Sequence, residues 1–406
     1  MKNNILVIGL GYVGLPLAIS LSKYFNVFGF DKSNKRINEL KKGIDYNKEV
    51  SKNAILNCKV KFLEKENEIF KDINTFIVTV PTPVDIKKKP DIKNLISACH
   101  LISKKVKKND LVIIESTVAP GTTENICLNL ISKKSKINKE HLNFCFSPER
   151  INPGDKKNKL INLEKIISGN NEKAIRLAEK IYKKVTKKVV IANSIKSAEL
   201  AKIIENAQRD ANISFMNEIY KICDLYKQNY KHVLSLCKTK WNFINFQPGL
   251  VGGHCVPVDP YYLIEDLKNK GFKSEVLYMS RKVNENFVNY ISKKIIKILK
   301  PIKNKKILFY GINFKDNVLD KRNSKFLLVY KKLFEKYKNN LILGDGNDII
   351  NKEDIKRSNI FIFGSKDKQT TEIINEIKKS KSRKVILNIF GNINFKNQKG
   401  LRLINL

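Results

Sequence analysis

Short apolar runs separated by longer polar stretches mark the first half of the chain. The apolar runs have the length of strands and occupy residues 4–9, 26–30, 75–80, 111–116, 143–146 and 188–192. Helical stretches, such as residues 31–42, lie between most of them. Uninterrupted apolar runs of this length fit strands buried on both faces, and these strands alternate with helices. The pattern therefore predicts α/β architecture with a doubly wound parallel sheet of the Rossmann type.

The pattern changes at about Ser194. Residues 194–227 hold no proline or glycine and keep a helical period, which predicts one long helix. Helical segments continue to about Leu299, and Pro301 then interrupts the chain. Strand-like runs return at residues 305–311, 341–345, 359–364 and 384–390. We therefore expect three domains: residues 1–193 with the first sheet, residues 194–300 around the long helix, and residues 301–406 with a smaller Rossmann-like sheet.

Composition narrows the class of protein. A chain of 406 residues is too long for one hydrophobic core. Its most apolar kind of run, residues 111–118, is far too short to span a bilayer, and the N-terminus lacks the layout of a signal peptide. Seven scattered cysteines, an odd number, indicate reduced thiols rather than a disulfide framework. We therefore expect a cytosolic protein without membrane contact.

The net charge of +39, from 78 basic and 39 acidic residues, has two readings. A basic excess is typical of nucleic-acid binding. It also results from compositional drift, because lysine, asparagine and isoleucine are abundant throughout the chain. The lysines are dispersed and are not interleaved with aromatic residues in a patch, so we favour drift and expect no nucleic-acid partner. An anionic substrate fits either reading.

A glycine-rich loop follows the first predicted strand and opens a predicted helix. The loop consists of Gly9, Leu10, Gly11, Tyr12, Val13 and Gly14. In such loops the first glycine allows a tight turn, the second lets the backbone approach a pyrophosphate, and the third allows close helix–strand packing. Asp31 closes the next strand, where an acceptor for a ribose hydroxyl is expected. This carboxylate favours NAD over NADP, although Arg36 lies near enough to weaken that preference.

The segment PGLVGGHCVPVDPYYL places Cys255 just ahead of a predicted helix start. The positive end of a helix dipole lowers the pKa of a thiol and favours the thiolate. Asp259 follows four residues later, and Gly252 and Gly253 have no side chains to block a ligand approaching the sulfur. A buried structural cysteine is an equally good reading of the spacing alone.

Further polar residues stand where ligands bind in α/β proteins. Lys202, Asn206 and Arg209 share one face of the long helix, although a solvated face is the alternative. Loops at the carboxyl ends of parallel strands commonly bind ligands. Three such loops contain residues 81–83, 116–117 and 147–154.

Taken in order along the chain, these segments resemble the nucleotide-sugar 6-dehydrogenases, the UDP-glucose/UDP-mannuronate dehydrogenase family. The resemblance rests on GLGYVGLPLA, VPTP, ESTVAPGTT, SPERINPGD, AKIIENAQRD, GLVGGHCVPVDPYYL and GINFKDNVLDKRNS. The stretches SPERINPGD, ENAQRDANI, KWNF and DPYYL are most similar to the branch acting on UDP-N-acetylhexosamines, in particular UDP-N-acetylglucosamine 6-dehydrogenases of surface-polysaccharide pathways. Val258 stands where the UDP-glucose branch often has lysine, and residues 341–350 lack that family's usual Tyr-Asp-Pro-like turn.

The resemblance implies a function and a division of labour. An N-terminal domain binds NAD, the long helix serves a homodimer, and the C-terminal domain binds UDP. The reaction oxidises a primary alcohol to a carboxylate with two NAD molecules, through a cysteine thiohemiacetal and thioester, and without a metal. UDP-glucose or UDP-N-acetylmannosamine are alternative substrates. A two-electron β-hydroxyacid dehydrogenase and a non-enzymatic nucleic-acid binder are more distant alternatives.

The resemblance also assigns residues. The implied catalytic residues are Cys255 as nucleophile, Lys202 and Asn206 as oxyanion donors, Asp259 and Glu149 in proton transfer, and Thr117 as a water-orienting hydroxyl. The cofactor set is Gly9, Gly11, Tyr12, Val13, Gly14, Asp31, Arg36, Pro81, Thr82, Thr117 and Arg322. The substrate set is Glu149, Arg150, Ile151, Lys202, Asn206, Arg209, Phe246, Gly249, Gly252 and Lys315.

Overall fold

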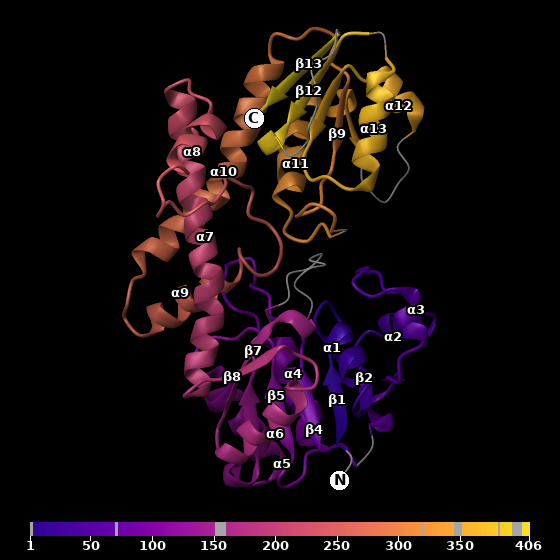
Figure 1. Ribbon diagram of the computed structural model, residues 1–406, viewed down its shortest axis with the longest axis vertical. Coiled ribbons are helices and arrows are strands. Elements are labelled where there is room, and N and C mark those ends of the chain that lie inside the picture. The colour runs from indigo at the N-terminus through magenta and orange to yellow at the C-terminus, as the bar shows by residue number, and fades with distance from the viewer. Residues whose placement is uncertain are drawn as a thin grey trace. The chain divides into compact units, whose positions relative to one another are not determined.

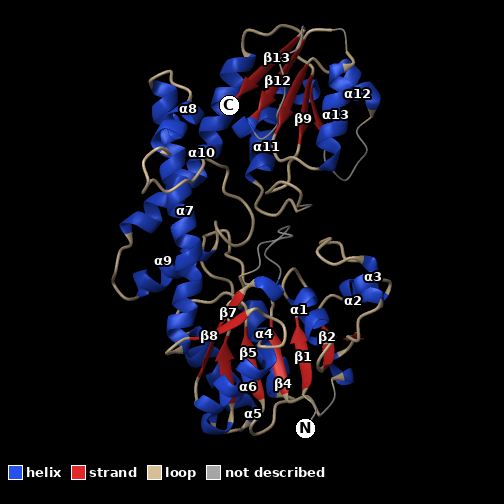
Figure 2. Ribbon diagram, in the orientation of Figure 1, coloured by secondary structure: helices blue, strands red, loops and turns tan. Residues whose placement is uncertain are grey.

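The computed structural model describes residues 3–69, 72–150, 160–318, 320–344, 351–380, 382–391 and 400–406. The chain divides into two compact units. The first unit comprises Met1–Glu205 and Tyr261–Lys273, and the second comprises Asn206–Pro260 and Ser274–Leu406. Each unit has its own sheet, and the strands of both are drawn in red in Figure 2.

The sheet of the first unit has eight strands in the order β3-β2-β1-β4-β5-β6-β7-β8. The strands are β1 (Asn4–Ile8), β2 (Asn26–Phe30), β3 (Lys61–Leu63), β4 (Thr75–Val78), β5 (Leu111–Ile114), β6 (Asn143–Phe146), β7 (Glu164–Gly169) and β8 (Lys188–Ile191). Neighbours are parallel except β6 and β7, which are antiparallel. The strand order reverses between β1 and β4, and ligands bind at such a switch point in open α/β sheets.

Alternate residues of each strand enter two different cores, as the period of a strand requires. Ile5 and Val7 pack on one face with α1, α2 and α6, and Leu6 and Ile8 pack on the other with α4, α5 and α7. These helices are α1 (Gly14–Leu21), α2 (Asn34–Lys41), α4 (Lys93–Ser103), α5 (Asn129–Ser135), α6 (Glu172–Tyr182) and α7 (Ile195–Leu225); the short α3 (Lys52–Leu56) lies between α2 and β3 in the chain. Because both faces are covered, β1, β4, β5 and β6 are mostly apolar, which is the pattern seen in the sequence.

Helix α7 is the predicted long helix, and Figure 1 shows it as one continuous element. It has 31 residues and contributes to both units. Ile195 and Ala198 belong to a core of the first unit, whereas Met216, Tyr220 and Cys223 belong to the core of the second.

The second unit contains a parallel five-stranded sheet in the order β10-β9-β11-β12-β13. Its strands are β9 (Ile307–Tyr310), β10 (Leu341–Gly344), β11 (Ile360–Phe363), β12 (Lys384–Asn388) and β13 (Leu401–Asn405). Its remaining helices are α8 (Tyr230–Cys237), α10 (Glu275–Leu299), α11 (Lys325–Tyr337), α12 (Lys352–Arg357) and α13 (Lys368–Lys378), while α9 (Asp259–Asn269) spans the boundary of the two units. The predicted fold class, with two Rossmann-like sheets and a long helix, is confirmed. Among the described residues, no helix combines the length and apolar character needed to cross a bilayer.

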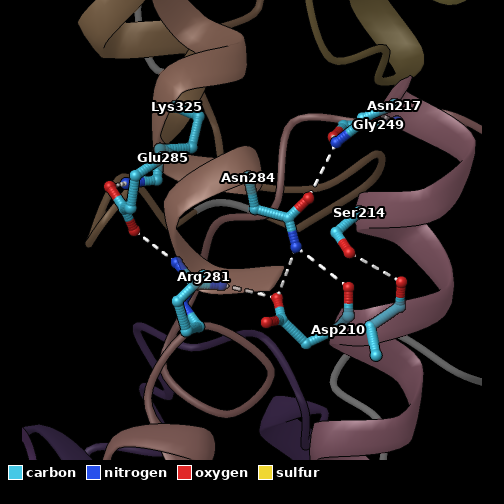
Figure 3. Close-up of polar contacts among 9 residues, drawn as sticks. Asp210, Ser214, Asn217, Gly249, Arg281, Asn284, Glu285 and Lys325 are labelled. Atoms are coloured by element: carbon cyan, nitrogen blue, oxygen red, sulfur yellow. Dashed lines mark hydrogen bonds and ion pairs between the residues drawn. The ribbon is translucent and has the colours of Figure 1, made fainter. Parts of the chain in front are cut away.

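A buried ion pair joins α7 to α10 in the second unit (Figure 3). Asp210 and Arg281 are each 1% exposed, and Arg281 Nη1 lies 2.5 Å from Asp210 Oδ1. Asn284 donates to the same carboxylate oxygen at 2.7 Å. Glu285 accepts a second bond from Arg281, and Lys325 of α11 lies 2.5 Å from Glu285. This cluster links three helices through a buried pair, Asp210 and Arg281, and a half-buried carboxylate, Glu285.

Replacing Asp210 with alanine should lower the free energy of unfolding by about 3–5 kcal/mol, because it leaves the Arg281 guanidinium buried without this carboxylate. Urea unfolding followed by circular dichroism measures the change. The control is Glu353→Ala, which removes an exposed i,i+4 partner of Arg357 and should cost less than about 0.5 kcal/mol. Equal losses in the two variants would contradict the interpretation of the cluster.

Candidate active site

The glycine loop after β1 has two glycines that packing requires and one that it does not. Gly9 has a φ of +93°, and a Cβ at Gly14 would lie 1.9 Å from the Gly9 carbonyl oxygen. At Gly11 a Cβ would meet no protein atom within 4 Å. The backbone of Gly11 is therefore open on the side where a pyrophosphate is expected to approach. Helix α1 begins at Gly14, two residues later than expected from the sequence.

Asp31, directly after β2, and Arg36, on α2, hold this loop. Asp31 Oδ2 accepts from the Leu10 amide at 2.8 Å, and Arg36 Nε donates to the Leu10 carbonyl at 2.9 Å. Arg36 is 3% exposed, and its Nη2 lies 2.8 Å from Asp45 Oδ1. The guanidinium is thus neutralised inside the protein and is not presented as a cation to a 2′-phosphate. These residues fit NAD, and the expectation that Arg36 weakens this preference is not supported.

The loops after β4 and β5 lie together. Thr82 Oγ1 donates to the Thr117 carbonyl at 2.7 Å, and Ser116 Oγ donates to the Val80 carbonyl at 2.7 Å. Thr82 and Thr117 are half-buried, whereas Pro81 is exposed. The structure therefore brings together the hydroxyl groups that the sequence assigned to two separate loops.

The loop after β6 carries Glu149, which is 8% exposed. Glu149 Oε1 accepts from the Arg150 amide at 2.6 Å. The guanidinium of Arg150 binds Glu205 on α7, with Nε 3.0 Å from Oε1. Arg150 thus already has a carboxylate partner, which a substrate phosphate must compete with. Ile151 lies outside the described residues.

The polar face of α7 is not uniformly solvated. Lys202 is 8% exposed, Asn206 is half-buried and Arg209 is exposed. Asn206 Nδ2 donates to Asp259 Oδ2 at 2.5 Å. A solvated face describes Arg209 alone among these three candidates.

Cys255 is half-buried and lies in the turn that leads into α9. The amides of Val258 and Asp259 donate to its carbonyl at 2.9 and 2.8 Å. Asp259 is the first residue of α9 and is 2% exposed. Cys255 therefore stands ahead of a helix, as expected, and is not a fully buried structural cysteine. Through Asp259, the turn that carries it is bonded to Asn206.

The two glycines before Cys255 have a role that the sequence did not indicate. A Cβ at Gly252 would lie 2.9 Å from the Asn323 carbonyl oxygen, and one at Gly253 would lie 2.8 Å from the ring of Phe314. Gly253 also has a φ of +89°. These positions are glycine because the segment before α11 packs on them. That they also leave space for a ligand at the sulfur stays a prediction.

A clamp on Gly249 fixes the neighbouring loop (Figure 3). Asn217 of α7 accepts from the Gly249 amide at 2.8 Å and donates to its carbonyl at 3.0 Å. Asn217 Nδ2, which donates to this carbonyl, also donates to Asn284 Oδ1 at 2.9 Å. Sequence reasoning missed Asn217, although it lies eleven residues after Asn206, which is close to three helical turns, on the same face. Phe246, at the start of this loop, is half-buried.

Arg322 and Lys315 belong to the segment before α11. Arg322 Nη2 lies 2.7 Å from Asp320 Oδ2 and 3.3 Å from His254 Nε2. Burial, and then the charge of Arg322, hold the pKa of His254 below its usual range. The Arg322 side chain is 58% exposed and Lys315 is half-buried. His254 thus connects the Cys255 turn to this segment as a neutral ring near neutral pH.

Most of the chain matches one known protein family. Residues 3–186 match the NAD binding domain of the UDP-glucose/GDP-mannose dehydrogenase family, and residues 196–286 match its central domain. The chain is 40% identical to the UDP-N-acetyl-D-glucosamine 6-dehydrogenase of Salmonella typhi, over 81% of this chain and 79% of that protein. It is 37% identical to Protein CapL of Staphylococcus aureus, over 92% of each.

The chain belongs to the UDP-glucose/GDP-mannose dehydrogenase family. The resemblance inferred from its motifs is thereby confirmed. Its structure is similar to that of the UDP-D-ManNAc dehydrogenase of Pyrococcus horikoshii, with a TM-score of 0.87, 28% identity and coverage of 99% and 98% of the two chains. It is an NAD-dependent nucleotide-sugar dehydrogenase, and the glycine loop and Asp31 are suited to hold NAD.

Gly11, where a Cβ would meet no protein atom, and Gly14, where a Cβ would clash, give a test of the cofactor loop of this dehydrogenase. Gly11→Ala should leave the melting temperature almost unchanged but weaken NAD binding by at least about tenfold, roughly 1.4 kcal/mol, because the added methyl projects only toward the cofactor. Gly14→Ala should lower the melting temperature, since its Cβ meets the Gly9 carbonyl. Thermal melting and calorimetric NAD titration separate the two effects. Unchanged NAD affinity in a folded Gly11→Ala protein would contradict the assignment.

Proposed function

We propose that this enzyme oxidises the C6 hydroxyl of a UDP-N-acetylhexosamine, UDP-N-acetylglucosamine first, to the uronate, for surface-polysaccharide biosynthesis. The name and 40% identity of the Salmonella typhi relative support this substrate. UDP-N-acetylmannosamine is the second candidate, because the similar Pyrococcus horikoshii structure carries that name. UDP-glucose remains a third.

The observation that carries the chemistry is the hydrogen bond from Asn206 to Asp259. It joins Asn206, an amide donor on α7, to Asp259, a carboxylate four residues after the half-buried thiol of Cys255. A two-electron alcohol dehydrogenase needs no such thiol. An alcohol that must become a carboxylate does, because the aldehyde formed first needs a nucleophile before it can lose a second hydride.

The overall reaction is R–CH₂OH + 2 NAD⁺ + H₂O → R–COO⁻ + 2 NADH + 3 H⁺. NAD, when bound, supplies the hydride acceptor. In the first oxidation the substrate hydroxyl gives its proton to water; we assign Asp259 to this proton transfer and Thr117 to the orientation of water near the nicotinamide. Lys202 and Asn206 donate to the oxygen as its negative charge develops. Cys255 Sγ then bonds to the aldehyde carbon, and the resulting oxyanion faces the same two donors.

The second oxidation converts this thiohemiacetal to a thioester. Water attacks the thioester carbon while Glu149 takes a proton from the water. The C–S bond breaks and its electron pair leaves with the sulfur, so that Cys255 is regenerated. At every step the substrate carbon is either bonded to the enzyme or held in the site. This accounts for an oxidation without released aldehyde.

Binding roles follow the family motifs. We assign the cofactor to Gly9, Gly11, Tyr12, Val13, Gly14, Asp31, Pro81, Thr82, Thr117 and Arg322, with Arg36 supporting the loop through the Leu10 carbonyl. We assign the substrate to Glu149, Arg150, Ile151, Lys202, Asn206, Arg209, Phe246, Gly249, Gly252 and Lys315. Residues 1–193 would bind NAD, residues 194–300 would dimerise and residues 301–406 would bind UDP. The odd number of scattered cysteines, seven, supports a cytosolic site of action.

The purified enzyme should release two NADH per uronate, with kcat/KM highest for UDP-N-acetylglucosamine among UDP-N-acetylglucosamine, UDP-N-acetylmannosamine and UDP-glucose. Cys255→Ser should lower uronate formation by about three orders of magnitude or more, because the hydroxyl is a poor nucleophile at neutral pH. NADH absorbance and chromatography of the uronate measure both quantities.

The matched control is Cys237→Ser, which changes another partly exposed thiol of the second unit and should leave the stoichiometry at two. A Cys255→Ser protein with full activity would indicate a two-electron dehydrogenase instead. No uronate from any of the three sugars would refute the proposed reaction.

A homodimer through α7 is supported by apolar side chains on that helix. Phe215, Ile222 and Leu225 are 56%, 44% and 80% exposed in the single chain. Exposed apolar clusters of this kind mark protein interfaces. Phe215→Glu combined with Leu225→Glu should convert a dimer to a monomer in light scattering coupled to size-exclusion chromatography. Phe334→Glu, on the exposed side of α11, should not. A wild-type protein that is monomeric at micromolar concentration would exclude the dimer.

A further inference from the structure

A cluster of buried charges lies beneath Glu149 in the first unit. Lys165, on β7, is 2% exposed, and its ammonium donates to Glu115 Oε2 at 2.8 Å. Glu115 is also 2% exposed and accepts a hydrogen bond from the Tyr182 hydroxyl. Glu149 Oε2 lies 3.7 Å from the same ammonium. One buried cation therefore faces two buried carboxylates, of which only Glu149 has a role in the proposed reaction.

Lys165 also holds the backbone that carries Glu149. Its ammonium donates to the Pro148 carbonyl at 3.1 Å, directly before Glu149. One position earlier, the Ser147 hydroxyl donates to the Ile166 carbonyl at 2.8 Å. Two consecutive residues of β7 thus fix the two residues that precede the carboxylate. A lysine inside a strand is costly to bury, and these contacts show what it holds in place.

We propose that Lys165, balanced by Glu115, is a positioning residue that keeps Glu149 ionised and oriented as the base for thioester hydrolysis. This inference rests on the proposed function of Glu149. Two carboxylates alone in a dry site would share a proton, and Glu149 could not accept one from water. The ammonium between them removes that restriction. Burial raises the pKa of Glu115 and Lys165 opposes the rise, which agrees with a shared cation.

Other charges surround this group. Among the described residues, the charged and titratable groups near Glu149 include Lys165 on β7, Glu115 after β5, Tyr182 on α6, Cys145 on β6 beside Tyr182, and the Arg150–Glu205 pair. Burial and the charge of Glu115 raise the pKa of Tyr182, so it remains a hydroxyl donor. Arg150 is matched by Glu205, which leaves Lys165 as the cation that changes the balance between the two buried acids.

The test is the pKa of Glu149 itself, read by infrared titration with ¹³C-labelled glutamate and assigned by the band that Glu149→Gln removes. Lys165→Met should move this titration to higher pH, because the opposite charge is lost. Glu115→Gln should move it to lower pH, because the like charge is lost while the ammonium stays. Lys173→Met, which removes an exposed lysine on α6, should leave it unchanged.

Enzyme turnover gives the second readout. At neutral pH, Lys165→Met should accumulate the Cys255 acyl-enzyme, detected by intact mass, and raising the pH should restore hydrolysis. A merely structural defect would not be restored in this way. If Lys165→Met does not fold, Glu115→Gln and the double variant Glu115→Gln/Lys165→Met still test the proposal. In the double variant, Glu149 should titrate between the pH values expected for the two single variants.

The outcomes separate the two proposals. A wild-type enzyme that releases uronate, with the Glu149 titration the same in all folded variants, would overturn the role of Lys165 and leave the function standing. Opposite pKa shifts in the two single variants, in a protein that makes no uronate, would support the charge arrangement and refute the proposed reaction.

Discussion

The polar face of α7 is the constraint on which both halves of the structure depend. Glu199, which is fully buried, accepts the amides of Gly121 and Thr123 and so fixes the loop that follows Thr117. Further along, Asn206 binds Asp259 and Asn217 clamps Gly249. A single helix rises by about 1.5 Å per residue with little freedom, so its side chains fix the positions of the loops they bind. Loops without secondary structure of their own thereby acquire definite positions.

Much of this architecture could be predicted because it follows from local pattern. Strands β1, β2 and β6 are short apolar runs flanked by turns, and their bounds were close to those expected. Strand β7 was missed because it begins with Glu164 and Lys165, which read as surface residues. Tertiary partners make a lysine acceptable there, above all Glu115, fifty residues earlier. Strand β3, with three residues, is too short to give a pattern.

Site residues could be predicted where their function depends on local sequence spacing. They could not be predicted where contacts between distant segments determine their surroundings. The glycine loop and its Asp31 lie in one βα unit, so their relation is local. Gly253 has a packing role that the sequence did not indicate, because the ring of Phe314, sixty-one residues away, lies against it. Arg36 looked like a free cation because its partner Asp45 belongs to a loop whose course the sequence does not reveal. In both cases a contact between distant segments changed the meaning of a correctly located residue.

Three buried ion pairs among the described residues can be compared: Arg36–Asp45, Lys165–Glu115 and Arg281–Asp210. Each is hydrogen-bonded, directly or through neighbouring side chains, to a loop with a proposed role in binding or catalysis. Such pairs contribute little net stability, since the cost of desolvating the charges offsets their attraction. Their directional bonds do restrict geometry, and the proposed oxidation of one carbon twice in one site needs that restriction. Asn206 illustrates the same principle with a neutral group. Its amide nitrogen carries two N–H donors, and the bond to Asp259 uses one and orients the other. The carboxylate proposed to move a proton therefore also aims the amide proposed to stabilise the oxyanion, so the two functions depend on one contact.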